Sequence, residues 1–387
     1  MKKTLLTICL VWMCFSLSAQ KIIDLSGKWS FSIDRQDNGE KEKWFSHTLN
    51  DFINLPGSMP EKLKGDEVTA KTQWTGSLYD SSYYYNPYME KYRKEGNIKF
   101  PFFLTPDKHY VGAAWYQKEV NIPADWKGER ILLFLERPHI ETTVWVNGQK
   151  TGMQNSLCVP HQYDITRYVR PGKCTITIRV DNRIKEINVG PDSHSITDQT
   201  QGNWNGIVGR ICLQTTPKTY FDDIQIYPEP EQKLARVKVV IKGTGTAKVK
   251  LSAESFNTDK KHIVPAIQQE IKLNKGVTET EMVLPMGNDM LLWDEFHPAL
   301  YKLKAEVTNG KKTEIKEIQF GMRRFEIKGK WFYVNGRKTQ LRGTVENCDF
   351  PLTGYAPMDV ESWERVFRIC RSYGLNHMRF HSFCPPE

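Results

Sequence analysis

Short β-type runs dominate the first half of this chain and most constrain what it can fold into. Between about residues 21 and 216 these runs are rich in β-branched and aromatic residues, and turn residues separate them. Asn147-Gly148, between two alternating runs, is a strong hairpin signal. The runs read KWSFSI, AWYQKEVNI, RILLFLE, TTVWVNGQ, CTITIRVDN and GRICLQT. No strong amphipathic helix interrupts them, so a β-sandwich or jelly roll is predicted for residues 20–217.

A second β region with a plainer composition follows. Its runs alternate between apolar and polar residues and read VKVVIKG, AKVKLSAES, ETEMVLPM, YKLKAEVTN and TEIKEIQFG. Alternation with a period of two is typical of strands that bury one face. The size of the region predicts an immunoglobulin-like sandwich of roughly seven strands over residues 218–325, with the character of a spacer.

The character of the sequence changes again over residues 326–387. A hairpin with Asn335-Gly336 at its turn precedes the strand-like run QLRGTVE. Residues 358–374 then predict an amphipathic helix that ends at Gly374, and LNHMRF predicts another strand. The apolar positions of the helix follow i, i+3, i+4, i+7 spacing and are Trp363, Val366, Phe367 and Cys370. A strand–helix–strand order with a short return predicts a βαβ unit that opens a parallel α/β architecture.

The first nineteen residues have the composition of a secretory signal peptide. MKK is a positive start, TLLTICLVWMCF is an apolar run of signal-peptide length, and SLSA offers small residues for cleavage before Gln20. We therefore expect residues 1–19 to be removed and the mature protein to be exported, to the periplasm or outside the cell. Neither this run nor any later stretch predicts a membrane-spanning helix.

Charge and cysteine usage narrow the choice of partners. Loss of Lys2 and Lys3 with the signal peptide lowers the formal charge from +9 to +7, and the basic residues are scattered. Nucleic-acid binding is therefore not predicted. Six cysteines remain in the mature chain, without CxxC or Cys/His metal spacing. Export permits disulfides, but Cys174 and Cys212 lie in apolar runs where small buried thiols are equally expected.

Aromatic residues are abundant, with 11 Trp and 16 Tyr. They fill cores, but flat rings also stack on sugar rings, so the composition favours sugar binding modestly. The tyrosine-dense stretch at residues 79–103 is expected to be a loop. Its tyrosines either pack on the sandwich or form a rim that contacts a sugar.

Seven stretches in order resemble family 2 glycoside hydrolases, which include β-galactosidases, β-glucuronidases and β-mannosidases. They are DLSGKWSF, GAAWYQKEVNIP, VWVNGQKTG, DQTQGNWNGIVGRICLQ, FHPALYKLKAEV, FGMRRFEIKGKWFYVNGRKTQLRGTVEN and GLNHMRFHSFCPP. The resemblance covers essentially the whole mature chain. It implies a mainly β, multidomain fold: a sugar-binding jelly roll, an immunoglobulin-like β-sandwich, and the first βαβ unit of a TIM (β/α)8 barrel.

Two stretches depart from the family pattern. ENCDFPLTG stands where the family usually has a His-containing loop after the first barrel strand, and HSFCPP replaces the usual Ser-His-Tyr-Pro. The substrate of the best-known members therefore cannot be carried over to this chain.

The resemblance implies a retaining β-glycosidase, which needs two carboxyl groups about 5–5.5 Å apart. In the family these are Glu residues at the ends of the fourth and seventh barrel strands. A complete barrel takes roughly 250 residues, whereas residues 326–387 suffice for two strands. We therefore expect this chain to be an N-terminal portion without either catalytic Glu. Glu346, Asp349 and Glu387 follow the two barrel strands, but we do not expect these carboxylates to replace the two catalytic Glu residues.

The remaining candidates in the βαβ unit bind rather than react. Arg379 matches the barrel Arg that supports the nucleophile in the family, and the alternative is a structural ion pair. His381 stands near the substrate-contacting His of the family, displaced in register. Asn347 and Asp349 occupy the loop after the first barrel strand and are further substrate-binding candidates.

Three more candidates lie at the end of the predicted sugar-binding domain. Asp198 aligns with an acidic residue that reaches the active site, which in some galactosidases joins a monovalent-cation and sugar-hydroxyl cluster; the alternative is an Asx turn cap. Asn203 lies in the same loop, and Trp204 either stacks on sugar or packs in the core. No cofactor is expected, apart from a Na or Mg ion in the complete enzyme.

These features predict an exported family 2 glycosidase, β-galactosidase-like, that hydrolyses O-glycosyl bonds of oligosaccharides and is represented here by its N-terminal portion. The alternatives are a non-catalytic carbohydrate-binding β-sandwich protein and an inactive remnant. A homo-oligomer is left open by the resemblance, as are the sugar and its linkage.

Overall fold

The computed structural model of this protein divides into two compact units. One consists of Lys21–Thr216 with Phe325–Glu387, and the other is built on Pro217–Arg324. The described residues are 20–69, 71–75, 85–99, 105–185, 193–198, 200, 202–350 and 353–386. The predicted signal peptide, residues 1–19, lies outside them, as does much of the tyrosine-dense stretch.

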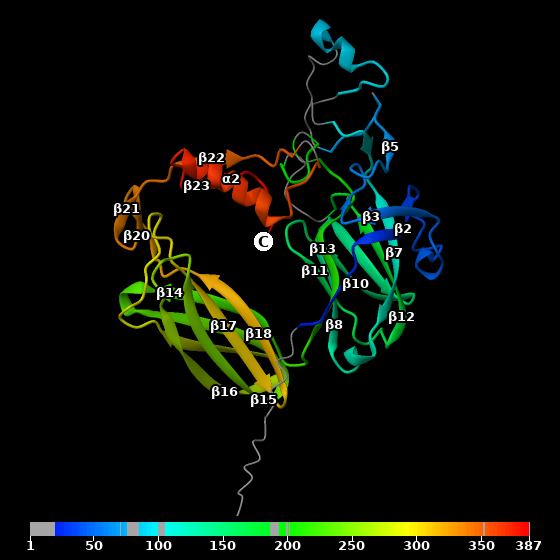
Figure 1. Cartoon of the computed structure of the whole chain (residues 1–387). Coiled ribbons are helices and arrows are strands. Elements are labelled where there is room, and N and C mark those ends of the chain that lie inside the picture. Colours follow the sequence, from blue (N-terminus) through cyan, green and yellow to red (C-terminus); the bar gives the residue numbers. More distant parts are fainter. Residues whose placement is uncertain are drawn as a thin grey trace, which may run out of the picture. The chain divides into compact units, whose positions relative to one another are not determined.

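Two β-sheets form the sandwich of the first unit (Figure 1). The smaller sheet has the strand order β1-β13-β8-β11, with β4 paired to β13. Its strands are β1 (Ile22–Asp24), β4 (Gly57–Ser58), β8 (Arg130–His139), β11 (His161–Asp164) and β13 (Gly206–Thr216).

The larger sheet has six strands in the order β10-β9-β12-β7-β2-β3. They are β2 (Gly27–Asp34), β3 (Asp51–Leu55), β7 (Ala113–Ile122), β9 (Glu141–Val146), β10 (Gln149–Asn155) and β12 (Gly172–Asp181). Every pairing in the two sheets is antiparallel. Two further short strands of the first unit, β5 (Asp66–Glu67) and β6 (Lys108–His109), pair with each other.

The core of this sandwich lies between the two sheets. Leu133 and Leu135 of β8 and Ile176 and Ile178 of β12 are fully buried and belong to one apolar cluster. Each such side chain contributes about 1.5–3 kcal/mol of favourable burial. The alternating runs of the sequence thus place one face of each sheet in a shared core, as a jelly-roll sandwich requires.

The second unit is also a β-sandwich, but two very long strands build it. β15 (Leu234–Phe256) pairs with β16 (Ile263–Pro285), and the register of the pair shifts between Gly243 and Gly245. The first half of β15 pairs with β14 (Tyr220–Glu229), and its second half with β17 (Leu300–Asn309), which pairs with β18 (Lys312–Phe320). Both halves contribute to one core. The positive φ angles of both glycines allow the bend that lets one strand serve two layers.

The C-terminal part of the first unit contains the predicted strand–helix–strand unit, which we name the βαβ segment (residues 343–380). β22 (Gly343–Glu346) and β23 (His377–Phe380) pair in parallel, and α2 (Val360–Ser372) connects them. Asp359 caps α2 by accepting a hydrogen bond from Ser362 N at 2.7 Å. The small sheet of β19 (Phe325–Lys328), β20 (Trp331–Val334) and β21 (Arg337–Thr339) precedes the segment.

The predicted helix is confirmed, although α2 begins two residues later and ends two residues earlier than predicted, and Gly374 has the positive φ of 75° that a helix-ending glycine adopts. No residue of α2 is buried. The apolar side chains of Phe367 and Ile369 are 46% and 48% exposed. A TIM barrel beyond this βαβ segment remains a prediction.

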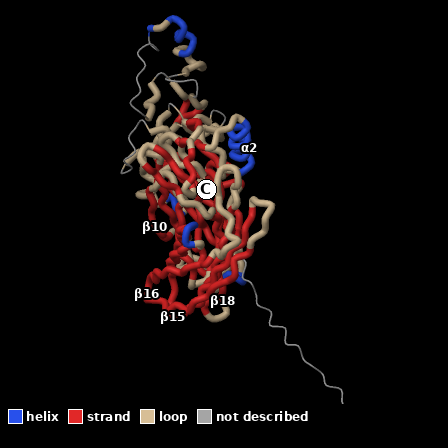
Figure 2. The backbone as a smooth tube through the Cα atoms, turned by 90° about the vertical axis from the view of Figure 1, so that its left-hand side faces the viewer, coloured by secondary structure: helices blue, strands red, loops and turns tan. Residues whose placement is uncertain are grey.

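Strands account for most of the described chain, and α2 is its one long helix (Figure 2). None of the helices in the ranges that the structure describes has the length and apolar character needed to cross a bilayer.

Tyr301 is the residue whose polar group most clearly supports the second sandwich. It is fully buried, and its hydroxyl lies 2.6 Å from His262 Nδ1 and accepts a hydrogen bond from Leu291 N at 2.9 Å. We expect Tyr301→Phe to lower the free energy of unfolding by about 1–3 kcal/mol, because two partners lose a hydrogen bond. Denaturant unfolding measures this. The control is Tyr227→Phe at a 49% exposed position, which should change little; equal effects would contradict the assignment.

The uncovered apolar surface of the βαβ segment predicts early proteolysis. Under reducing conditions, trypsin should release the C-terminal piece at basic residues between residues 325 and 342 before it cuts the strands of either sandwich. Time-resolved digestion with mass spectrometry measures the order of cleavage. A C-terminal piece that stays attached after the sandwich strands are cut would contradict this prediction.

Candidate functional site

A cavity of about 300 Å³ lies where four loops of the first unit meet, and we name it the loop cavity. The loops are the turn after β4, the segment leading into β6, the loop before β13, and the loop after β22. Its lining residues are Ser58, Pro60, Glu61, Leu63, Thr105, Pro106, Asp107, His109, Asp198, Thr200, Gly202, Asn203, Trp204, Phe350, Thr353 and Gly354. The cavity is therefore bounded both by the jelly roll and by the βαβ segment.

Asp198 lies in the wall of the loop cavity with its carboxylate almost fully buried. One carboxylate oxygen accepts a hydrogen bond from Thr75 N, and the other accepts one from Asn203 N at 3.3 Å. His109 Nε2 lies 3.5 Å from that second oxygen. The carboxylate of Asp198 thus accepts hydrogen bonds from its own loop, as a structural cap does. The residue also lines the cavity, as a substrate-binding residue would.

Three buried polar atoms beside Asp198 have no hydrogen-bond partner within the described residues. They are His109 Nε2, Asn203 Oδ1 and Trp204 Nε1. All three residues line the loop cavity. Leaving a buried polar group unpaired costs about 1–3 kcal/mol, so each such atom calls for a partner that a bound polar molecule could supply.

A network of buried asparagines fixes the loop that carries these residues. Asn203 Nδ2 donates to Asn182 O at 3.0 Å, and Asn182 Nδ2 donates to Asn203 O at 3.1 Å. Asn205 Nδ2 donates to Val180 O at 3.0 Å, and its Oδ1 accepts from Tyr116 OH at 2.7 Å. The loop is therefore tied to the end of β12 by side-chain hydrogen bonds that replace regular strand pairing.

Trp204 joins the jelly roll to the loop after β22. Its ring stacks on His139 with centroids 4.4 Å apart, and its other neighbour is the ring of Tyr355 at 5.5 Å. Tyr355 in turn donates a hydrogen bond to Glu61 Oε2 at 2.8 Å. Trp204 is 4% exposed, so most of its ring packs against protein, although one edge lines the cavity.

The four candidates of the βαβ segment lie elsewhere in the first unit. Asn347 and Asp349 are exposed and flank the buried Cys348. Arg379 is exposed on β23 and lies opposite Val345 in the parallel register. None of these candidates is among the described residues that line the loop cavity.

His381 follows β23 and donates its backbone N–H to Glu346 O at 2.9 Å. Its ring lies against that of His194, with centroids 4.2 Å apart. Burial, His194 and the charge of Arg379 together lower the pKa of His381. The two interpretations of Arg379, support of a nucleophile and a structural ion pair, both stay predictions.

The surroundings of Asp198 do not fit a monovalent cation. Its oxygens face two backbone N–H groups and His109, which satisfy a carboxylate rather than share it with a metal. The residues that the structure describes contain no group of three or more His, Cys, Asp or Glu side chains placed to hold a metal ion.

The sequence-based candidates Asp198, Asn203 and Trp204 line the loop cavity, whereas His109, which also lines it, and Asn182, which supports its wall, were not among the candidates. His109 stands in a short run, KHY, without a distinctive motif, and Asn182 ends a strand with an ordinary turn residue. The one available signal was their polarity next to buried strands, which does not distinguish a site residue from a structural one.

Comparison with known proteins identifies the family to which this architecture belongs. Residues 22–217 match the family profile described as "Glycosyl hydrolases family 2, sugar binding domain", and residues 219–323 match "Glycosyl hydrolases family 2". The chain belongs to glycosyl hydrolase family 2. The loop cavity therefore lies at the end of the family 2 sugar-binding domain, next to the βαβ segment.

The family 2 relatives include enzymes with two different names. A β-glucuronidase of Paenibacillus borealis is 24% identical over 355 residues, covering 87% of this chain and 51% of the relative. A β-galactosidase of Thermoanaerobacter pseudethanolicus is 24% identical over 301 residues, covering 73% and 38%. The human β-glucuronidase is 23% identical over 394 residues, covering 92% and 53%. The chain thus spans about half the length, or less, of these relatives.

Solved structures of other proteins share the fold. A Ruminococcus gnavus β-glucuronidase in complex with C6-substituted uronic isofagomine aligns with a TM-score of 0.66 at 19% identity, covering 96% of this chain and 57% of that one. The mainly β, multidomain fold predicted from the sequence is confirmed.

Burial of His139 beneath Trp204 predicts acid sensitivity of the first unit. Burial lowers the pKa of His139 from 6.5 to about 3. The folded state therefore holds this ring neutral, while the unfolded state protonates it below pH 6.5. The resulting stability is complete above that pH and is lost as the pH falls toward the folded pKa, by about 1.4 kcal/mol per pH unit.

The test is denaturant unfolding of wild type and His139→Gln between about pH 4 and 7. The variant should show a pH dependence smaller by one proton. His47→Gln, at an exposed position, is the control and should keep the wild-type slope. An unchanged slope in His139→Gln would show that this ring is not held neutral.

Proposed function

We propose that this chain carries the sugar-holding side of a family 2 β-glycosidase active site, centred on the loop cavity. The observation that supports this most is the set of unpartnered buried polar atoms of His109, Asn203 and Trp204 around Asp198. A sugar presents hydroxyl groups that both donate and accept hydrogen bonds. Such a molecule can satisfy an acceptor such as Asn203 Oδ1 and a donor such as Trp204 Nε1 at the same time.

Asp198 is proposed to hold a sugar hydroxyl rather than to react. Its carboxylate already accepts hydrogen bonds from two backbone N–H groups, which keep it oriented as an acceptor. The other carboxylate of the wall, Glu61, accepts from Tyr355 OH and lies 2.6 Å from Lys62 Nζ. Both groups are engaged as fixed acceptors, whereas a general acid must exchange a proton with the leaving group.

The hydrolysis itself is proposed to proceed with retention, by the two-carboxyl chemistry of double displacement. We propose that the acid and the nucleophile are not among residues 1–387 and that Arg379 supports them from the end of β23. The exposed position of Arg379 opposite Val345 leaves its guanidinium available to a carboxylate.

The substrate is proposed to be a terminal β-linked galactoside or glucuronide of an oligosaccharide, on the names of the relatives. Export through residues 1–19 is proposed as the route by which the protein meets such a substrate. If the guanidinium of Arg379 contacts the sugar, its charge favours a uronic acid as substrate. If a carboxylate of the protein pairs with this guanidinium, a neutral sugar is favoured.

Hydrolysis of p-nitrophenyl β-D-galactoside and p-nitrophenyl β-D-glucuronide by the product of the complete gene tests this function. Release of nitrophenol from one of them is expected. Sugar binding by residues 20–387 without hydrolysis by the complete product would instead establish a carbohydrate-binding protein. A product that neither binds nor hydrolyses β-linked sugars would contradict the proposal.

Asp198→Asn should lower kcat/KM by roughly 10- to 100-fold, because charged hydrogen bonds contribute about 1.5–3 kcal/mol. The loss should appear mainly in KM, since the carboxylate holds the sugar in the ground state as well as in the transition state. Steady-state kinetics on the hydrolysed substrate measure both. Asp125→Asn, at an exposed salt bridge with Lys21, is the control and should leave the kinetics unchanged. A selective loss of kcat would assign Asp198 to the reaction step instead.

A further inference from the structure

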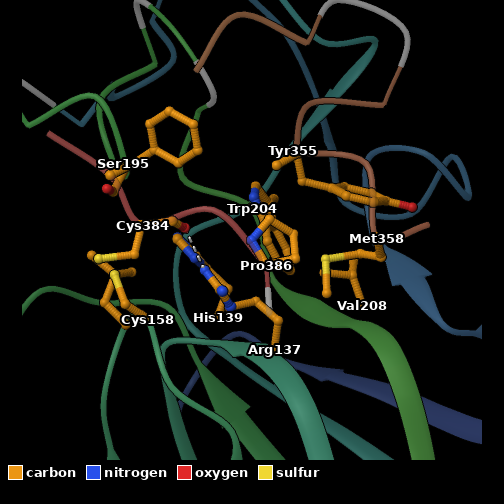
Figure 3. Close-up of a pocket in the computed structure, with 13 residues that line it drawn as sticks. Arg137, His139, Cys158, Ser195, Trp204, Val208, Tyr355, Met358, Cys384 and Pro386 are labelled. Atoms are coloured by element: carbon orange, nitrogen blue, oxygen red, sulfur yellow. Dashed lines mark hydrogen bonds between the residues drawn. The ribbon is translucent and has the colours of Figure 1, made fainter. Parts of the chain in front are cut away.

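Cysteines from separate parts of the sequence meet around a second, smaller cavity of about 20 Å³ (Figure 3). Cys158 follows β10 of the jelly roll, and Cys384 follows β23 of the βαβ segment. Both line this cavity together with Arg137, His139 and Trp204. Neither belongs to the loop cavity or to the proposed sugar contacts.

The two sulfur atoms lie side by side (Figure 3). Cys384 lies close enough to Cys158 to help raise the pKa of the Cys158 thiol, and both side chains line the same small cavity. The residues are 226 positions apart in the sequence, so only the docking of the βαβ segment on the jelly roll brings them together.

The backbone around Cys384 is held in place from the jelly-roll side. Arg137 donates from Nη1 to Cys384 O at 3.1 Å and from Nη2 to Pro385 O at 3.2 Å. Ser195 Oγ donates to Ser382 O at 2.5 Å. These bonds restrain the Cys384 loop close to Cys158 before any covalent link exists, and such restraint lowers the entropy that a link must remove.

We propose that Cys158 and Cys384 form a disulfide that ties the sugar-binding domain to the loop after β23. A metal site is a poorer explanation, because the described residues contain no third His, Cys, Asp or Glu ligand placed to complete one. The proposal does not depend on glycosidase activity, and it requires only that the protein meets a disulfide oxidant.

The chemistry balances with oxidised glutathione as the oxidant. The exposed Cys384, as a thiolate, attacks one glutathione sulfur, so that the glutathione S–S bond breaks and one glutathione thiolate leaves. Cys158 then loses its proton and attacks the Cys384 sulfur, which releases the second glutathione. Two protein thiols are oxidised to one disulfide, and one glutathione disulfide is reduced to two thiols.

The two thiols are suited to different steps. Burial and the neighbouring Cys384 raise the pKa of Cys158, so it is the slower group to ionise and acts second. Cys348, a nearby third thiol, is fully buried, and burial with the carboxylates of Glu346 and Asp349 raises its pKa strongly. It is shielded from a soluble oxidant, which favours the Cys158–Cys384 pair.

Trypsin separates the three cysteines, which makes the test direct. Cleavage after Lys150, Arg167, Arg342, Arg365 and Arg379 places Cys158 in residues 151–167, Cys348 in residues 343–365, and Cys384 in the peptide that begins at Phe380. The purified full chain is incubated with oxidised glutathione, remaining thiols are blocked with N-ethylmaleimide, and non-reduced peptides are weighed.

The expected result is a linked pair of residues 151–167 with the peptide that begins at Phe380, lighter by two hydrogen atoms than the two free peptides together. The link should disappear after reduction. A link from residues 151–167 to residues 343–365 would overturn the proposal, and so would the absence of any link involving Cys158.

Variants separate a specific bridge from adventitious oxidation. Cys384→Ser and Cys158→Ser should each abolish the oxidised species, whereas Cys370→Ser, which removes a half-buried thiol of α2, should leave it intact. After limited trypsin digestion without reductant, the C-terminal piece of wild type should remain attached to the jelly roll and be lost in Cys384→Ser. Equal retention in both would count against the bridge.

Discussion

The packing of Trp204 between His139 and Tyr355 is the contact on which the loop cavity depends. His139 ends β8 of the jelly roll, and Tyr355 belongs to the loop after β22. One side chain therefore positions two walls that come from opposite ends of the sequence. It also separates the loop cavity from the smaller cavity that Cys158 and Cys384 line, because Trp204 borders both.

The buried polar groups around Trp204 explain why this contact is specific. Asn182, Asn203 and Asn205 satisfy backbone groups at the end of β12, where the chain leaves the sheet. A buried backbone group without a partner would cost about 1–3 kcal/mol, so an apolar replacement at these positions is disfavoured. The same network leaves Asn203 Oδ1 without a partner at the edge of the cavity. Structural and binding roles thus meet in one loop.

Local patterns in the sequence predicted local structure well. Alternating runs predicted the sandwich strands, Asn147-Gly148 predicted the β9–β10 hairpin, and apolar spacing with Gly374 predicted α2. The second unit was expected to have about seven short strands, whereas its described strands are β14 to β18 and two of them, β15 and β16, are 23 residues long. Bends at glycines hide the continuity of these two strands in the sequence. The family resemblance predicted domain boundaries. It did not predict that residues 325–387 share a compact unit with the jelly roll.

The site was only partly predictable for a physical reason. Asp198, Asn203 and Trp204 lie within seven residues and share a recognisable loop, whereas His109, Glu61 and Thr353 reach the cavity from distant segments. The contact of Cys158 with Cys384 is equally non-local, and composition or spacing carries no signal for it. Conversely, the candidate pairs Asn347 with Asp349 and Arg379 with His381 are not among the described residues that line the loop cavity.

Hydrogen exchange by mass spectrometry, with and without D-galactose or D-glucuronic acid, tests most directly whether the loop cavity binds a sugar. Binding there should slow exchange together in residues 202–205 and 353–358, because the sugar would contact both walls and stiffen the Trp204–Tyr355 contact. Slowed exchange in both segments is the predicted result. A sugar that binds but slows exchange only in strands remote from these loops would contradict the assignment of the cavity as the sugar site.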